Sequence, residues 1–166
     1  KDKQLNFYQL HYLYMRSFYP EIPMSEAVQK AHNYYLEQIN THWLHQSLYA
    51  KGLMGLIAHR NNKIKLANAI VLSLKENSII DDALGMYWKA NRNSGHWHSA
   101  PIETQALLIE AFTEIRADNT SVDLMKVWLL KHKQTHKWPS TKATTDATYA
   151  LLLSGSNWTT SSENIE

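Results

Sequence analysis

A short phrase that occurs twice near the C-terminal end constrains the fold more than any other feature of this chain. The first copy reads Trp97-His-Ser-Ala-Pro-Ile-Glu-Thr104-Gln-Ala106, and the second reads Trp138-Pro-Ser-Thr-Lys-Ala-Thr-Thr145-Asp-Ala147. In both copies a Thr follows the Trp after seven positions and an Ala after nine, and the two Trp residues lie 41 positions apart. A spacing of roughly 40 residues is typical of helical-pair repeats. Each copy therefore predicts a bulky ring in a loop, followed by a helix that begins with small residues and packs closely on its neighbour.

Long helices are expected along most of the chain, because only five Gly and four Pro interrupt it. Ser25 and Pro101 stand where an N-cap and a first helical residue are expected. Gly52 and Gly55 lower helix propensity within a predicted helix, so we interpret them as places where two helices approach closely. The predicted helices span residues 5–18, 26–43, 47–59, 63–75, 101–117, 121–135 and 140–154.

Residues 76–100 break the helical period. Met86-Tyr-Trp88 and His96-Trp-His98 are short aromatic runs on either side of the turn-rich stretch 91–95, which favours a small β-hairpin near residues 86–99. About seven helices with short connections predict an all-α fold, a partial α/α toroid of helical-pair repeats, with an α-solenoid or an irregular bundle as alternatives. Residues 1–155 are expected to form this domain, and residues 156–166 a polar tail or linker.

Composition excludes several classes of function. The net charge of +2 is too small to indicate nucleic-acid binding. The chain has no Cys, which excludes disulfides, thiol catalysis and Cys-containing zinc sites within it. No apolar run approaches the ~18 residues that a membrane-spanning helix needs, so no membrane insertion is expected. Because the chain begins inside a helical pattern, we expect it to be a piece of a larger protein.

Candidate sites are few. His96 and His98 would share a face if that stretch is extended, and His132 and His136 have i, i+4 helical spacing, but neither pair has a recognisable third ligand. Asp81 and Asp82 are adjacent, so their side chains diverge, and we interpret them as turn or cap residues.

Glu103 follows Pro101 and is interpreted as a first-turn residue that favours the helix dipole. These patterns together predict no catalytic residue, no metal site and no cofactor.

Two stretches resemble the closing helices of the thioester domain of α2-macroglobulins, particularly the bacterial members. They are Val127-Trp-Leu-Leu-Lys-His-Lys-Gln134 with Trp138-Pro-Ser-Thr-Lys-Ala-Thr-Thr-Asp-Ala-Thr-Tyr-Ala-Leu-Leu-Leu153, and Ala100-Pro-Ile-Glu-Thr-Gln-Ala-Leu-Leu-Ile-Glu-Ala-Phe112. Leu48-Tyr-Ala-Lys-Gly-Leu-Met-Gly-Leu-Ile-Ala58 is similar to another helix of that domain. The likeness covers roughly residues 45–155.

The resemblance implies an α/α toroid, of the kind also found in terpenoid cyclases and prenyltransferases, in a bacterial protease trap of the periplasm or cell envelope. The chain would then be a non-catalytic part of an endopeptidase inhibitor, and its partners would be the other domains of the parent and, through the parent, target proteases. The family's thioester forms at a Cys-Gly-Glu-Gln motif. This chain contains neither Cys nor Gly-Glu-Gln, so no thioester residue is assigned to it.

Exposed aromatic residues mark interaction surfaces, so we predict an inter-domain contact at Tyr87, Trp88 and Trp97. Two other functions remain open. A helical-repeat scaffold that binds a protein or peptide would present a concave, open superhelix. A toroid glycosidase or cyclase-like enzyme would need paired carboxylates facing one cavity, for which Asp81, Asp82 and Glu103 are the candidates.

Overall fold

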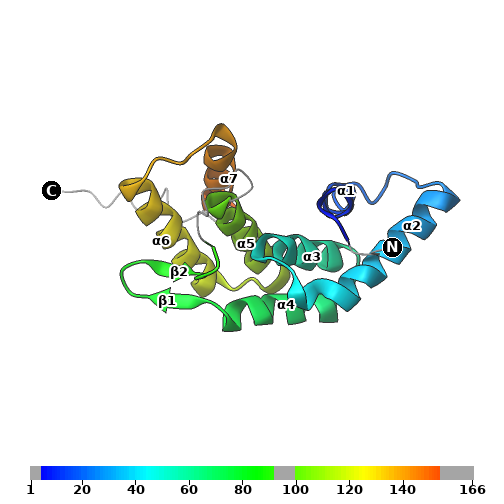
Figure 1. Ribbon diagram of the computed structural model, residues 1–166, viewed down its shortest axis with the longest axis horizontal. Helices are drawn as coiled ribbons and strands as arrows, with labels where there is room; N and C mark the ends of the chain where they lie inside the picture. The colour runs from blue at the N-terminus through cyan, green and yellow to red at the C-terminus, as the bar shows by residue number, and fades with distance from the viewer. Residues whose placement is uncertain (1–4, 92–99, 154–166) are drawn as a thin grey trace.

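The computed structural model describes residues 5–91 and 100–153, and these residues confirm the all-α prediction (Figure 1). Every predicted helix is present, with its ends within a few residues of the expected positions. A short 3-10 turn, Trp43–His45, follows α2. The helices are α1 (Phe7–Arg16), α2 (Glu26–His42), α3 (Leu48–Arg60), α4 (Ile64–Glu76), α5 (Pro101–Arg116), α6 (Asn119–Thr135) and α7 (Thr141–Leu152). No described helix has both the length and the apolar character needed to cross a bilayer.

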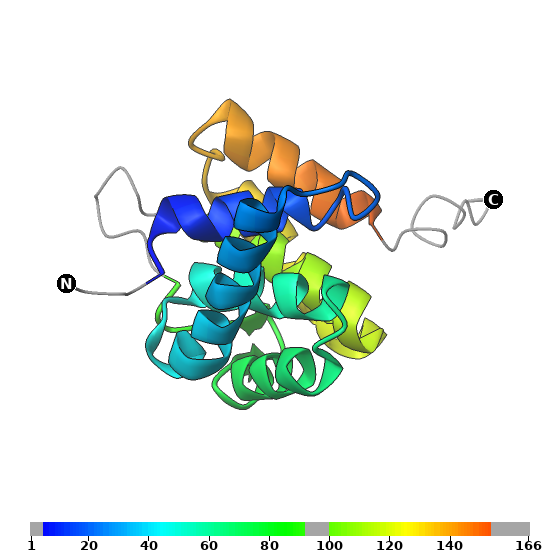
Figure 2. The same cartoon turned by 90° about the vertical axis from the view of Figure 1, so that its right-hand side faces the viewer.

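The odd-numbered helices pack in a row. α1 contacts α3, α3 contacts α5, and α5 contacts α7, while α4 packs against α3 and α5, and α6 packs against α5 and α7. Figure 2 shows α1 and α4 on opposite sides of α3.

Helix α5 is the centre of the core. Every residue from Pro101 to Phe112 is buried, and Ile102, Leu108 and Phe112 are completely so. α7 packs on α5 through a face of small residues (Ala143, Ala147 and Ala150), which are also completely buried. Both copies of the repeated phrase lead into these two helices, and the close packing predicted for a helix with small residues is confirmed for α7. Trp97 lies outside the described residues.

The close helix contacts expected at Gly52 and Gly55 are confirmed. A Cβ atom on Gly52 would lie 3.1 Å from Cδ2 of Leu107 on α5, and one on Gly55 would lie 3.3 Å from Cδ1 of Ile115. α3 can therefore approach α5 closely because these two positions carry no side chain.

The structure has a small hairpin in this region, but it is not the predicted pairing of residues 86–88 with 96–98. Strand β1 (Ile79–Asp81) pairs antiparallel with β2 (Gly85–Tyr87), so the turn of this hairpin falls at residues 82–84. The physical reason is the carboxylate of Asp81, which accepts hydrogen bonds from the backbone N–H groups of Ala83 (2.9 Å) and Leu84 (2.8 Å). Residues 96–98, expected to form the second strand, lie outside the described residues.

Gly85 closes this turn in the left-handed region, with φ +78°, and packs directly on α6. A Cβ atom there would overlap the backbone oxygen of Leu124. We expect Gly85→Ala to lower the free energy of unfolding by about 2–4 kcal/mol, because backbone strain and overpacking add. Urea unfolding measures this change. Ala83→Gly, in the same exposed turn, is the control, and an equal loss in both variants would contradict the packing explanation.

Candidate functional site

The predicted contact at the hairpin needs a correction at Trp88. Its ring is only 2% exposed and packs edge-to-face on Phe112, with ring centroids 6.2 Å apart. Its indole N–H donates to the backbone oxygen of Leu74 at 2.8 Å and so satisfies the C-terminal end of α4. Trp88 is therefore a core residue, and its expected surface exposure is wrong. Tyr87 is half-buried, Trp97 lies outside the described residues, and a contact at these two residues stays a prediction.

The carboxylates considered as an acid pair lie on separate parts of the molecule. Asp81 caps the hairpin turn, as expected, and the exposed Asp82 follows it. Glu103 is in the first turn of α5, as expected, and its Oε1 accepts a long hydrogen bond (3.4 Å) from the hydroxyl of Ser140 at the start of α7. Figure 1 shows the hairpin and α7 well apart.

The histidines of α6 form part of a ring ladder. The rings of Trp128 and His132 have centroids 5.0 Å apart, and those of His132 and His136 lie 5.1 Å apart. Burial lowers the pKa of His132, and the neighbouring His136 lowers it further. Over the residues that the structure describes, no group of three or more His, Cys, Asp or Glu side chains is placed to hold a metal ion. His96 and His98 lie outside that part of the chain.

A charged cluster fastens α1, α3 and α5 together. The guanidinium of Arg60 donates to Glu110 at 2.7 Å and to Glu114 at 2.6 and 2.8 Å. It lies 4.1 Å from the ring centroid of Phe18, and the hydroxyl of Tyr14 donates to Glu110 at 2.9 Å. The cluster brings together residues 96 positions apart in the sequence.

Each proton in this cluster is held firmly. Burial raises the pKa of Tyr14, and the negative charge of Glu110 raises it further. Burial alone would lower the pKa of Arg60, but hydrogen bonds to Glu114 and Glu110 outweigh it and raise that pKa above its usual value. The cluster therefore joins α1, α3 and α5 through hydrogen bonds from two groups, Tyr14 and Arg60, that keep their protons near neutral pH.

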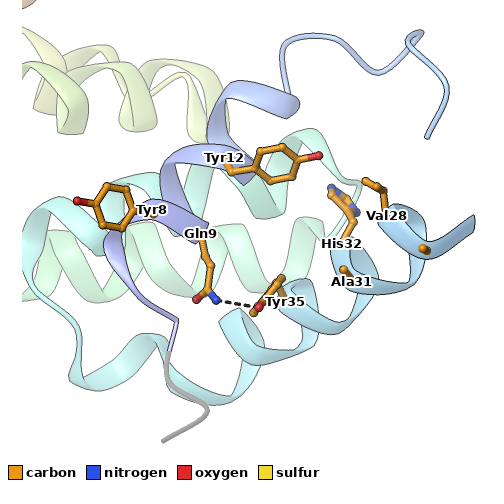
Figure 3. A pocket seen from close by; sticks show the side chains of 8 residues that line it. Tyr8, Gln9, Tyr12, Val28, Ala31, His32 and Tyr35 are labelled. Carbon is orange, nitrogen blue, oxygen red and sulfur yellow. Dashed lines mark hydrogen bonds between the residues drawn. The ribbon is translucent and has the colours of Figure 1, made fainter. Parts of the chain in front are cut away.

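An aromatic groove between α1 and α2 is the candidate site that sequence reasoning missed (Figure 3). The groove has a volume of about 440 Å³. The amide of Gln9 donates to the hydroxyl of Tyr35 at 2.7 Å across it. Its lining is almost wholly apolar or aromatic and consists of Tyr8, Gln9, Tyr12, Ala27, Val28, Ala31, His32 and Tyr35.

Other exposed aromatic and aliphatic side chains lie on α1, on α2 and on the segment between them, and together with the groove we name them the aromatic face. Tyr8 is 82% exposed, and α2 buries only His32 and Ile39 along its length. The other members of the aromatic face are Phe7, Tyr12, Met15, Phe18, Tyr19, Ile22, Val28 and Tyr34. Rings and aliphatic side chains at this density suit stacking and apolar contact. The high density of aromatic residues in 7–18 is the sequence feature that could have indicated this site. Hydrophobic periodicity alone, however, does not show whether such a helix buries its rings in the core or exposes them to a binding partner.

Comparison with known proteins finds no matching family model, no similar curated protein and no similar solved structure.

The Arg60 cluster yields a stability prediction. We expect Arg60→Met to lower the free energy of unfolding by about 2–4 kcal/mol, because it leaves the buried carboxylate of Glu110 without its cation. Denaturant unfolding at neutral pH measures the loss. Lys142→Met is the matched control, since it breaks the ion pair between Lys142 and Asp146, in which the two side chains are 65% and 32% exposed. We expect this control to lower the free energy of unfolding by less than about 1 kcal/mol. Equal effects of the two substitutions would show that burial does not set the cost.

Proposed function

We propose that this chain is a non-catalytic helical domain of an α2-macroglobulin-like endopeptidase inhibitor of the bacterial cell envelope. Three stretches that resemble the family's thioester domain form α3, α5 and the pair α6–α7. In this proposal the row α1–α3–α5–α7 is an arc of an α/α toroid, and α2, α4 and α6 lie outside that arc. The helical-pair order and the close packing at Gly52 support it.

The observation that carries the proposal is the aromatic face. Soluble monomers rarely expose apolar patches of this kind without a partner, and Tyr is enriched where proteins bind one another. In the proposed assembly the aromatic face contacts another part of the parent protein. Tyr87 and Trp97 remain the proposed second contact.

The charged groups described above support a structural role. Glu110 and Glu114 bind Arg60, Asp81 caps a turn, and Glu103 faces the start of α7. The chain has no Cys and so supplies no thioester sulfur. Any covalent capture of a protease by the parent would therefore use residues outside this chain.

The experiment that tests the proposal compares the full-length parent with and without methylamine by intact mass, followed by protease trapping of both samples. A methylamine adduct with lost trapping would support a thioester trap in which this domain is a structural support. Trapping without an adduct would support a conformational trap without covalent chemistry. If the parent forms no methylamine adduct and traps no protease, the inhibitor proposal is rejected.

A second candidate function is a helical-repeat scaffold that binds a peptide, and the groove between α1 and α2 is the observation that favours it. A cleft of about 440 Å³ between two diverging helices, lined by aromatic side chains, suits the apolar side chains of a bound segment. A parent that traps no protease but retains a peptide ligand through Tyr8 and Tyr12 would favour this function.

The aromatic face yields a direct prediction. We expect the double substitution Tyr8→Ser, Tyr12→Ser to change the stability of the isolated chain by less than about 1 kcal/mol, because both rings are exposed. In the full-length parent the same substitutions are expected to increase the hydrodynamic radius and to reduce protease trapping.

Tyr149→Ser is the matched control, since Tyr149 is an exposed tyrosine on α7 that does not belong to the aromatic face. Unchanged compactness and trapping in the double variant would remove the aromatic face from the proposal.

A further inference from the structure

A second cavity, with a volume of about 370 Å³, lies where the end of α1, the first half of α2 and the junction of α3 with α4 meet. Its lining is basic. The side chains of Arg16, His32, Arg60 and Lys63 all contribute to it, together with amide groups such as that of Asn61. None of the described residues that line this cavity is acidic.

Arg16 is the buried cation of this cavity. Only 8% of the residue is exposed, and its guanidinium donates to the backbone oxygens of Tyr19 and Ile22. No ion pair joins Arg16 to a carboxylate within residues 5–91 and 100–153. Two carbonyl contacts explain how Arg16 holds the connection between α1 and α2, but they do not balance its charge. A buried charge without a counter-ion is costly, and a guanidinium has five N–H donors, so further donors remain.

His32 supplies an unpartnered buried polar atom beside this cation. The residue is 6% exposed, and its Nδ1 atom is buried without a hydrogen-bond partner. Burial lowers its pKa, and the positive charge of Arg16 lowers it further. Figure 3 shows the imidazole reaching from α2 toward α1. A bound anion would accept a hydrogen bond from this ring and stabilise its protonated form, which would raise the pKa of His32.

The other two cations are partly balanced. Arg60 is bound by Glu110 and Glu114, which leaves its Nη1 atom with a long contact (3.4 Å) to the hydroxyl of Ser17. Lys63 is half-exposed and lies 3.5 Å from Glu37. The excess positive charge is therefore concentrated at Arg16, with Lys63 at the entrance of the cavity.

We propose that this cavity binds a phosphate-type oxyanion, held by the guanidinium of Arg16 and the imidazole of His32. An oxyanion of this class has several acceptor oxygens and forms short charge-assisted hydrogen bonds with arginine. The cavity is large enough for the free ion with water or for a small phosphate ester. The proposal stands on the geometry of these residues and does not depend on the proposed function of the chain.

The test titrates the whole chain with inorganic phosphate, with sodium sulfate and with methyl phosphate, using sodium chloride at matched ionic strength as the reference. NMR chemical shifts of the Arg16 and His32 side chains report binding. We expect saturable shifts with a Kd of about 1 mM or tighter for phosphate or sulfate, and none with chloride. Tighter binding of methyl phosphate than of inorganic phosphate would identify an ester as the source, and the reverse order would identify the free ion.

Substitutions then locate the site. Arg16→Met and His32→Gln are each expected to weaken binding by about tenfold, and Lys63→Met by a few-fold, because the first two side chains are buried in the cavity. Lys65→Met, an exposed lysine that does not line the cavity, is the control and is expected to bind as the unsubstituted chain does. Arg16 also stabilises the connection between α1 and α2, so the Arg16→Met variant could fail to fold. In that case the His32→Gln variant still tests the proposal.

The pH dependence provides an independent readout. Sulfate keeps its charge over the range used, so any change in its affinity reports on the protein. The charged groups that line the cavity with His32 are Arg16 from α1, Arg60 from the end of α3 and Lys63 at the start of α4, all positive, and the side chain of Asn33 is the neutral polar group that acts on the pKa of His32. We expect sulfate to bind more tightly as the pH falls below 6.5 and to raise the pKa of His32. Absence of saturable shifts would overturn the proposal, and so would Arg16 and His32 variants that bind sulfate as tightly as the unsubstituted chain does.

Discussion

Helix α5 is buried on every side along its first three turns, and the positions of α3, α4, α6 and α7 follow from how they cover it. A helix of this kind gains stability only when its neighbours approach closely, because loose contacts forfeit dispersion energy. The chain provides that approach with small residues on the covering helices, Gly52 on α3 and Ala143 and Ala147 on α7. Met86 and Trp88 of the hairpin complete the cover near α6, and the buried amide of Gln105 binds the hairpin by donating to the backbone oxygen of Met86 at 2.8 Å.

Polar groups buried around this core serve mainly to fix geometry. Arg60, Glu110 and Tyr14 set the position of α1 on α3 and α5, and Trp88 satisfies a backbone oxygen at the end of α4. Their hydrogen bonds are largely satisfied, which is what a structural network requires. Arg16 differs, since it is buried without a carboxylate partner, and His32, which lines the same cavity, is one of the buried side chains with an unpartnered atom. The combination of a buried cation and an unpartnered nitrogen in one cavity motivates the anion proposal.

The two surfaces of α2 have different chemistry. One side of the helix faces the aromatic groove through Val28, Ala31 and Tyr35, and the other borders the basic cavity through Gln29 and Asn33. His32 lines both. An anion bound at Arg16 would therefore fix the half of α2 that the core leaves exposed, and it would set the width of the groove. The proposed contact surface and the proposed anion site are thus physically linked through one helix.

The sequence by itself determined the all-α class, the approximate bounds of every helix and the close contacts at Gly52 and Gly55, because apolar spacing, caps and breakers act over a few residues. It also indicated a hairpin that includes Tyr87, but it paired residues 86–88 with the wrong segment. The strand 79–81 was missed because the turn depends on hydrogen bonds from the backbone amides of Ala83 and Leu84 to Asp81, which composition does not reveal. Only the tertiary structure decided that Trp88 is core, that the aromatic residues of α1 are exposed, and that Arg16, His32 and Lys63 share a cavity. Those outcomes depend on which face of each helix is buried by other helices, and the helices that bury it come from distant parts of the sequence.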